Sequence, residues 1–110
     1  MKVDVKQTGE IVVFSIEGDV DATNAPELAE LFKAEMAENV NLVADFAKVD
    51  FISSAGLRAL LATVKEARRQ GGDLRLAATQ KDVDKVLTIS GFTRIIKTYK
   101  NLDEAMKSYS

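Results

Sequence analysis

The chain has 110 residues, of which 46% are hydrophobic, so it is long enough for one compact core but not for two. Its 15 basic and 17 acidic residues give a formal charge of -2 without a basic cluster, which argues against a nucleic-acid-binding surface. The lack of cysteine and histidine excludes disulfides, thiolate chemistry, a Ser-His-Asp triad and the usual zinc sites within this chain. We therefore expect one domain over residues 1–110, with neither a metal nor a cofactor.

The amino-terminal part of the chain predicts a hairpin followed by a helix. Residues 3–7 alternate between apolar and polar, Thr8-Gly9 is typical of a turn, and residues 11–17 are rich in β-branched side chains. Pro26 suits the first turn of a helix, where its missing N–H costs nothing. A helix over residues 26–38 is then indicated by apolar side chains three and four positions apart, namely Leu28, Leu31, Phe32 and Met36.

The middle of the chain predicts a buried strand and a second helix. Residues 41–46 are short and mostly apolar, and because they lie between two helices they are typical of a parallel strand. The second helix is expected to begin at Ser53 and Ser54 and to continue to Gln70, where Gly71-Gly72 stops it. Its apolar stripe consists of Leu57, Leu60, Leu61 and Val64.

The last third of the chain continues the alternation of strands and helices. Residues 74–78 predict a strand, a short third helix ends near Ser90-Gly91, residues 94–99 predict a fifth strand, and a last helix follows. The apolar positions that indicate these two helices are Val83, Val86 and Leu87, and then Leu102, Ala105, Met106 and Tyr109. The order ββαβαβαβα predicts an α/β fold, in which the later strands are largely parallel and joined by right-handed crossovers.

No segment of the chain has the pattern of a membrane span or a leader. The first residues, MKVDVKQTGEIVVF, carry charges at every second or third position and then only a short apolar run. No later run reaches the roughly 18 apolar residues that a spanning helix requires. We therefore expect a cytoplasmic protein that does not insert into membranes. Nothing in the pattern demands an oligomer, so we expect a monomer.

Two adjacent serines mark the junction between the third strand and the second helix. Ser53 and Ser54 follow an apolar, strand-like segment, at the edge where open α/β sheets usually carry their sites. A purely structural interpretation is also available, because a serine is a good helix cap and Gly56 allows close packing against the sheet. Residue chemistry alone leaves both interpretations open.

The residues around the serines resemble a known signature. The segment ADFAKVDFISSAGL, which ends at Leu57, is similar to the signature of the anti-sigma-factor antagonist family, the STAS domain. A second segment, IEGDVDATNAPEL at residues 16–28, resembles the acidic stretch that precedes the first helix in that family. Length, element order and the Gly71-Gly72 turn agree, so the resemblance covers essentially the whole chain. The matching positions of the signature are Asp45, Phe51, Ile52, Ser54, Gly56 and Leu57.

The resemblance implies a regulator rather than a catalyst. In this family the serine that matches Ser54 is phosphorylated by a partner anti-sigma factor, which is an ATP-dependent serine kinase, and a PP2C-type phosphatase removes the phosphate. The unmodified form binds the anti-sigma factor and releases the sigma factor. Asp21 falls on the acidic position of the neighbouring loop, with Asp19 beside it. The implied partner surface comprises Asp19, Asp21, Ser53, Ser54, Ala55, Gly56, Leu57 and Arg58.

The signature departs from its commonest form at two positions. Ser53 stands where an aspartate usually precedes the phosphoacceptor, and Ala55 stands where a second hydroxyl is frequent. The substitution at residue 53 affects kinase recognition or helix capping, and it makes Ser53 the fallback phosphoacceptor.

Three alternatives accompany this interpretation. Asp45 is a candidate phosphorylatable aspartate, as in receiver domains, or an anchor for the loop that presents the serines. A small enzyme with Ser54 as nucleophile needs a base, and Asp21 or Asp45 would be poor at activating a serine. The third alternative is a STAS module that is never phosphorylated and acts as a scaffold in a signalling complex or a transporter.

Overall fold

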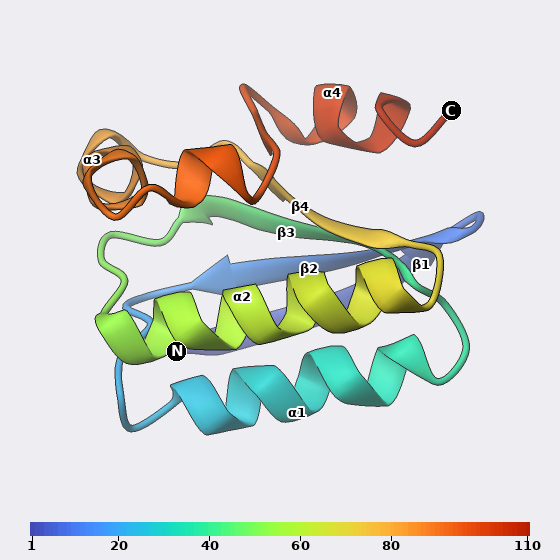
Figure 1. The fold of residues 1–110 in the computed structure, drawn as a ribbon, viewed down its shortest axis with the longest axis horizontal. Coiled ribbons are helices and arrows are strands. Elements are labelled where there is room, and N and C mark those ends of the chain that lie inside the picture. The colour runs from blue at the N-terminus through green and yellow to red at the C-terminus, as the bar shows by residue number, and fades with distance from the viewer.

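The computed structural model describes residues 1–110 and contains a five-stranded sheet whose strands lie side by side in chain order (Figure 1). Strand β1 (Lys2–Thr8) pairs antiparallel with β2 (Ile11–Glu17). The remaining strands follow in parallel: β3 (Asn41–Lys48), β4 (Asp73–Ala77) and β5 (Thr98–Tyr99). The helices are α1 (Ala25–Met36), α2 (Ser54–Arg69), α3 (Lys81–Ile89) and α4 (Leu102–Lys107). The expected order ββαβαβαβα and the largely parallel sheet are confirmed.

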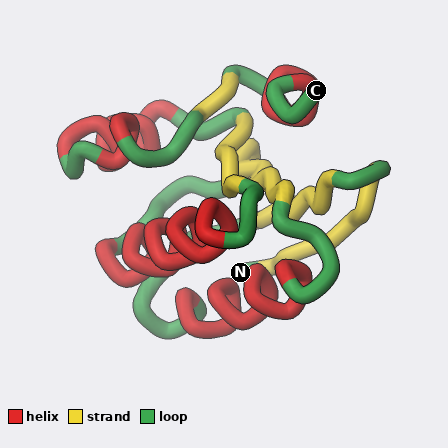
Figure 2. Tube along the Cα trace, turned by 45° about the vertical axis from the view of Figure 1, so that its right-hand side comes forward, coloured by secondary structure: helices red, strands yellow, loops and turns green.

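The helices cover the two faces of the sheet unequally. Because the crossovers step in one direction across the sheet, α1, α2 and α3 pack on the same face, where they share one core with the strands. The other face is covered by α4 over β3, β4 and β5. Figure 2 shows the strands between the pair α1 and α2 and the C-terminal helix. Over β1 and β2 this second face carries mostly exposed polar side chains.

The main core follows from the apolar periodicities of the strands and helices. Phe14 of β2 meets Phe32 of α1 edge to face, with ring centroids 4.7 Å apart, and both are fully buried. Full burial of each such side chain contributes roughly 1.5–3 kcal/mol. The stripe expected on the second helix is buried at Leu57, Leu60 and Val64. The core therefore fixes the position of α2, which carries the two serines.

The glycine pair after α2 makes the tight return into β4. Gly71 has a φ of +93°, which suits glycine best, and it ends the helix as expected. A Cβ built on Gly72 would lie only 2.0 Å from the carbonyl oxygen of Val40. The close approach of these two backbone segments thus requires glycine at residue 72.

The expected fifth strand over residues 94–99 is wrong in its extent. Gly91 adopts a φ of +81° and precedes a 3-10 turn, Phe92–Arg94, which the Ile95 N–H closes by bonding to the Phe92 carbonyl at 2.9 Å. Ile96 is buried in the main core, so its apolar character reflects packing there rather than a place in a strand. The strand is left with Thr98–Tyr99.

A buried carboxylate links α2 to the start of β4. Asp73 accepts hydrogen bonds from Arg68 Nε at 2.9 Å and from Arg75 Nε at 3.0 Å. Its side chain is 7% exposed, and that of Arg75 is 13% exposed. Since a buried charge is costly without partners, the two arginines offset the burial of this side chain.

The same group of residues fastens the C-terminal segment onto the sheet. Arg75 donates to the carbonyl of Ser108 at 2.7 Å, and its guanidinium lies 4.0 Å from the centre of the Tyr109 ring. The Tyr109 hydroxyl lies 2.7 Å from the Leu42 carbonyl oxygen and 2.8 Å from that of Asp73, and burial raises its pKa. We call Arg68, Asp73, Arg75, Ser108 and Tyr109 the Asp73 cluster.

Candidate functional site

The two serines have different roles at the start of α2. Ser53 is the N-cap residue, with extended backbone angles of φ -87° and ψ 172°, and its Oγ accepts the Gly56 N–H at 3.2 Å. Ser53 is also half-buried. Its hydroxyl therefore already satisfies one of the free N–H groups at the helix start.

Ser54 is the first residue of α2, and its hydroxyl is free. The residue is exposed, and no hydrogen bond to its Oγ is present. The N–H groups of Ser54 and Ala55 also lack a protein partner, as is normal in the first turn of a helix. An anionic group on Ser54 would therefore lie beside free donors and the positive end of the helix dipole.

A backbone clamp holds the loop between β2 and α1 against the serines. Val20 N–H bonds to the Phe51 carbonyl at 2.9 Å, and Ser53 N–H bonds to the Val20 carbonyl at 2.9 Å. These bonds make a parallel bridge between Val20 and Ile52. Figure 1 shows the ends of β2 and β3 and the start of α2 together at one end of the molecule.

Gly56 fits tightly against this clamp. A Cβ on Gly56 would lie 2.7 Å from Cγ1 of Ile52 and 2.9 Å from Cγ1 of Val20. The close packing expected at Gly56 is therefore made against two loop side chains that bridge the sheet end, rather than against the strands. A larger residue there would push the start of α2 away.

Asp21 organises the loop in front of α1. Its Oδ1 accepts from the Thr23 hydroxyl at 2.6 Å, from Thr23 N–H at 3.0 Å and from Asn24 N–H at 3.2 Å. The Thr23 hydroxyl is the main cause that holds the pKa of Asp21 below its usual value. The Asn24 side chain accepts the Asp21 N–H at 2.9 Å through its Oδ1 and donates to the Asp19 carbonyl at 3.0 Å through its Nδ2. Asp21 thus remains ionised near Ser53, while the side chain of Asp19 is exposed.

The other residues named from the sequence separate into surface and core. Arg58 is exposed and forms no ion pair, and Ala55 is half-buried. Leu57, in contrast, is only 8% exposed and packs in the main core, so it offers little surface to a partner. Phe51 was matched as part of the signature but not named as a surface residue, although it is 49% exposed. Adjacent residues of an extended segment face opposite ways, so burial of the aliphatic Ile52 predicts that Phe51 faces outward.

Asp45 lies apart from the serines. It shares the face of Val43, on the side covered by α4, and β3 continues past it to Lys48. Its Oδ1 accepts the Ala47 N–H at 3.0 Å, within the strand. The expectation that Asp45 anchors the serine loop is therefore wrong, because the Val20 clamp does so. Neither Asp45 nor Asp21 is hydrogen-bonded to Ser54.

The site and the fold define a class of protein. The STAS domain family model matches residues 2–105, and the chain therefore belongs to the STAS domain family. Among characterised sequences, the chain is 31% identical over 114 residues to BtrV of Bordetella bronchiseptica, described as a candidate anti-sigma factor antagonist, covering 99% of this chain and 95% of BtrV. It is 29% identical over 96 residues to the anti-sigma-B factor antagonist of Bacillus subtilis, covering 87% and 88%. By sequence and fold, this chain is a member of the anti-sigma-factor antagonist group.

Solved structures show the same fold at lower identity. A candidate anti-sigma factor antagonist from Thermotoga maritima superposes with a TM-score of 0.91 at 21% identity, covering 96% of this chain and 92% of that one. The phosphorylated form of SpoIIAA, a Bacillus cell fate determinant, has a TM-score of 0.76 at 18% identity, covering 99% and 100%. A sulfate transporter family protein from Wolinella succinogenes has a TM-score of 0.81 at 16% identity, covering 92% and 85%. None of the helices of this chain combines the length and apolar character needed to cross a membrane.

Proposed function

We propose that this protein is an anti-sigma-factor antagonist switched by phosphorylation of Ser54. In its unmodified form it binds an anti-sigma factor that is also a serine kinase, and so releases a sigma factor. A PP2C-type phosphatase resets the switch, and the cycle takes place in the cytoplasm. The observation that carries this proposal is the exposed, unbonded hydroxyl of Ser54 at the first position of α2.

The position of Ser54 allows a phosphate without unfolding. A phosphate adds about -1.5 to -2 charge at neutral pH, and at a helix amino terminus this charge is favourable. The main core does not include Ser54, so added bulk stays outside the packed interior. The modification therefore changes the surface while the fold persists.

The same charge opposes partner binding. Asp21 stays ionised in the adjoining loop and Asp19 is exposed, so a phosphate at Ser54 makes this end of the molecule strongly negative. A partner surface shaped around a neutral serine would then meet both bulk and uncompensated charge. A thousandfold weaker complex requires only about 4 kcal/mol, which one phosphate in a desolvated contact supplies.

The partner surface that we propose is centred on Ser54. It combines the exposed side chains of Asp19, Phe51 and Arg58 with the half-buried Ser53 and Ala55. Exposed aromatic and arginine side chains are the types that most often dominate binding energy at interfaces. Gly56 and Leu57 do not contact the partner in this proposal; their packing in the interior positions the first turn of α2.

Phosphate mapping tests this proposal directly. The protein is incubated with its cognate anti-sigma kinase and ATP, and the modified residue is located by mass spectrometry. We expect one phosphate on Ser54, lost in Ser54→Ala and retained in Ser53→Ala, and we expect phosphorylation to abolish kinase binding. Phosphate on Ser53, or none on either serine, would contradict the proposed switch.

A scaffold that is never phosphorylated is the second candidate. It is favoured by the similarity of fold to a sulfate transporter family protein and by Ser53, which replaces the aspartate of the commonest signature. In that case the same surface binds its partner constitutively. Partner binding that survives Ser54→Asp unchanged would support this candidate.

A further inference from the structure

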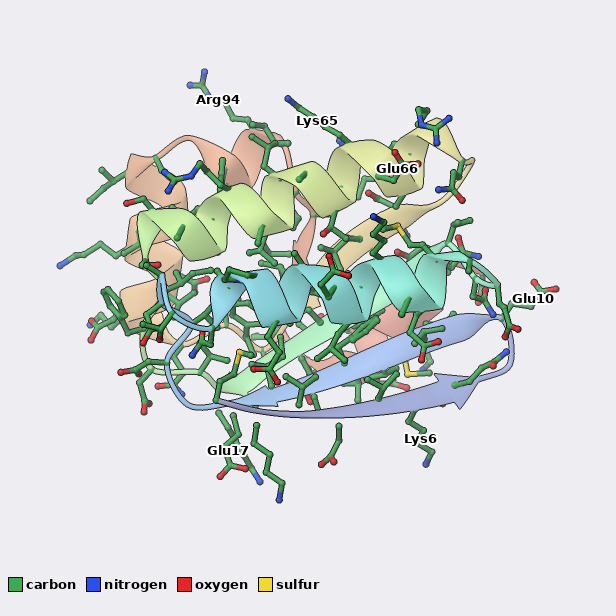
Figure 3. All side chains as sticks on the ribbon, turned by 90° about the horizontal axis from the view of Figure 1, so that it is seen from below. Lys6, Glu10, Glu17, Lys65, Glu66 and Arg94 are labelled. Carbon is green, nitrogen blue, oxygen red and sulfur yellow. The ribbon has the colours of Figure 1, made fainter.

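Strand β1 is the longer of the two edges of the sheet, since β5 has only two residues. It pairs with β2 on one side, and no strand pairs with it on the other. Most of its residues are exposed, including Val5 at 37%. Figure 3 shows β1 as the outermost strand, with no helix beyond it, and Lys6 pointing away from the side that α1 covers. An exposed strand edge presents unpaired N–H and C=O groups to another chain.

The hairpin determines which groups of β1 face outward. The two-residue turn Gly9-Glu10 closes at the pair Thr8 and Ile11, so these two residues exchange both hydrogen bonds of a close pair. Hydrogen-bonded and non-hydrogen-bonded pairs alternate along an antiparallel ladder. The backbone groups of Val3, Val5 and Gln7 therefore point to the open edge.

The side chains of β1 carry an alternating charge pattern. Lys2, Asp4 and Lys6 share the solvent-exposed face of the strand, and none of them forms an ion pair within the chain. Such charges are free to pair with a strand placed against this edge, and they also restrict how it is placed.

We propose that β1 pairs antiparallel with β1 of a second copy. The two-fold axis passes midway between the two Val5 residues, and we call this the axis through Val5. All seven residues of the strand then overlap, and Val3, Val5 and Gln7 supply six backbone hydrogen bonds across the axis. Asp4 lies directly opposite the partner's Lys6, and by symmetry this contact occurs twice. The two five-stranded sheets become continuous.

Other registers of this pairing are disfavoured by charge or by overlap. An axis through Asp4 places Asp4 opposite itself and Lys2 opposite the partner's Lys6, and an axis through Lys6 places Lys6 opposite itself. These are non-hydrogen-bonded pairs, where side chains are closest, so like charges repel most strongly. An axis through Val3 or Gln7 overlaps only residues 2–4 or 6–8. The register through Val5 is thus selected by the sequence of β1 itself.

This interface is small, and we expect a weak dimer that exchanges with monomer. None of its residues belongs to the Ser54 surface, so the pairing stands independently of the proposed switch. The sequence pattern alone predicts a monomer, because which strand forms an exposed edge depends on the order of the strands in the sheet.

Sedimentation velocity over a concentration series tests the pairing, from about 10 µM to about 1 mM. We expect a shift from monomer to dimer across this range. Val5→Pro removes the outward N–H at the axis without touching the bonds between β1 and β2, so it is expected to abolish association while the circular dichroism melt stays cooperative. A wild-type protein that sediments as a monomer throughout would overturn the proposal.

Charge variants test the register even if Val5→Pro fails to fold. Lys6→Asp places two carboxylates opposite each other twice, and we expect the dissociation constant to rise about tenfold to a hundredfold. The double variant Asp4→Lys with Lys6→Asp restores opposite charges and is expected to restore association. Dimerisation that is unchanged in Lys6→Asp, or not recovered in the double variant, would overturn the assignment of the axis to Val5.

Discussion

Two ends of the sheet treat their polar side chains differently. At the amino ends of β3 and β4, the side chains of the Asp73 cluster bind to one another. At the carboxyl ends, the first turn of α2 leaves the Ser54 hydroxyl free. Asp73 has two arginine partners and a side chain that is 7% exposed. Ser54 has no side-chain partner and is exposed. At the carboxyl end, Ser53 and Asp21 are hydrogen-bonded within the chain, but the hydroxyl of Ser54 is not.

This difference separates residues that maintain the fold from residues that are available to other molecules. The Asp73 cluster fastens α4, while Ser54 contributes nothing to the core. Substitutions at the amino end are therefore expected to change the free energy of unfolding, and substitutions at Ser54 to change partner affinity. Four predictions, each with a control, sharpen or break this separation.

The largest effect is expected for partner binding by Ser54→Asp. A carboxylate at this position imitates part of the phosphate charge, so we expect affinity for the anti-sigma kinase to fall by up to about a thousandfold, or about 4 kcal/mol. Isothermal titration calorimetry measures this change. The free energy of unfolding should stay within about 0.5 kcal/mol, because the substitution is exposed and at a helix amino terminus.

Ser110→Asp is the matched control for this variant. It adds the same charge at an exposed residue outside the helices, so it should leave partner affinity unchanged. Undiminished binding by Ser54→Asp would favour the constitutive scaffold.

The next effect is expected for stability at the Asp73 cluster. Asp73→Ala leaves Arg75, whose side chain is 13% exposed, without its carboxylate, and we expect a loss of about 3 kcal/mol in the free energy of unfolding. Urea denaturation measures it. As a control, Asp103→Ala removes an ion pair with Lys107 whose side chains are 73% and 75% exposed, and should cost under about 0.5 kcal/mol. Equal losses in the two variants would show that the cluster is not the stabilising end.

A smaller effect is expected at the helix cap. Ser53→Ala removes the acceptor of the Gly56 N–H and should lower the free energy of unfolding by about 1 kcal/mol. Ser53→Asp should recover this loss, since aspartate caps as well as serine. If Ser54→Ala proved as destabilising as Ser53→Ala, the division of roles between the two serines would be wrong.

The smallest effect concerns the acid sensitivity of the loop before α1. Because the Thr23 hydroxyl lowers the pKa of Asp21 from its usual 3.8, Asp21 stabilises the folded state above that value. The contribution is lost as the pH falls through the lowered pKa. Titration of the Thr23 amide resonance by NMR should show this step, and Asp21→Asn should remove it. A Thr23 resonance that titrates equally in Asp21→Asn would refute the assignment.

Much of the fold was predictable because local pattern and tertiary packing agree in it. The spacing of Leu28 and Phe32 identifies the buried face of α1, and Gly71-Gly72 marks the end of α2. Local pattern and tertiary packing disagree at residues 94–99. The apolar pair Ile95 and Ile96 is as typical of a strand as of a turn that packs against the core. Gly91 was the signal, since its positive φ turns the chain before a strand begins.

The candidate site was predictable in place but not in detail. The junction of strand and helix located both serines, yet which hydroxyl caps the helix depends on the backbone angles at Ser53. Leu57 had two conflicting interpretations, as part of the apolar stripe and as a surface neighbour of Ser54, and packing decided for the first. The clamp between Val20 and Ile52 joins segments far apart in the chain, so no local pattern indicates it.

The tight seat of Gly56 has a kinetic meaning for the proposed switch. Since a Cβ at Gly56 would lie within 3 Å of Ile52 and Val20 side-chain carbons, we expect the first turn of α2 to keep its seat when Ser54 is modified. The response then needs no slow rearrangement of the domain. Under the proposed switch, the turnover of the kinase and the phosphatase would set its speed, and the amounts of those two enzymes would set the delay.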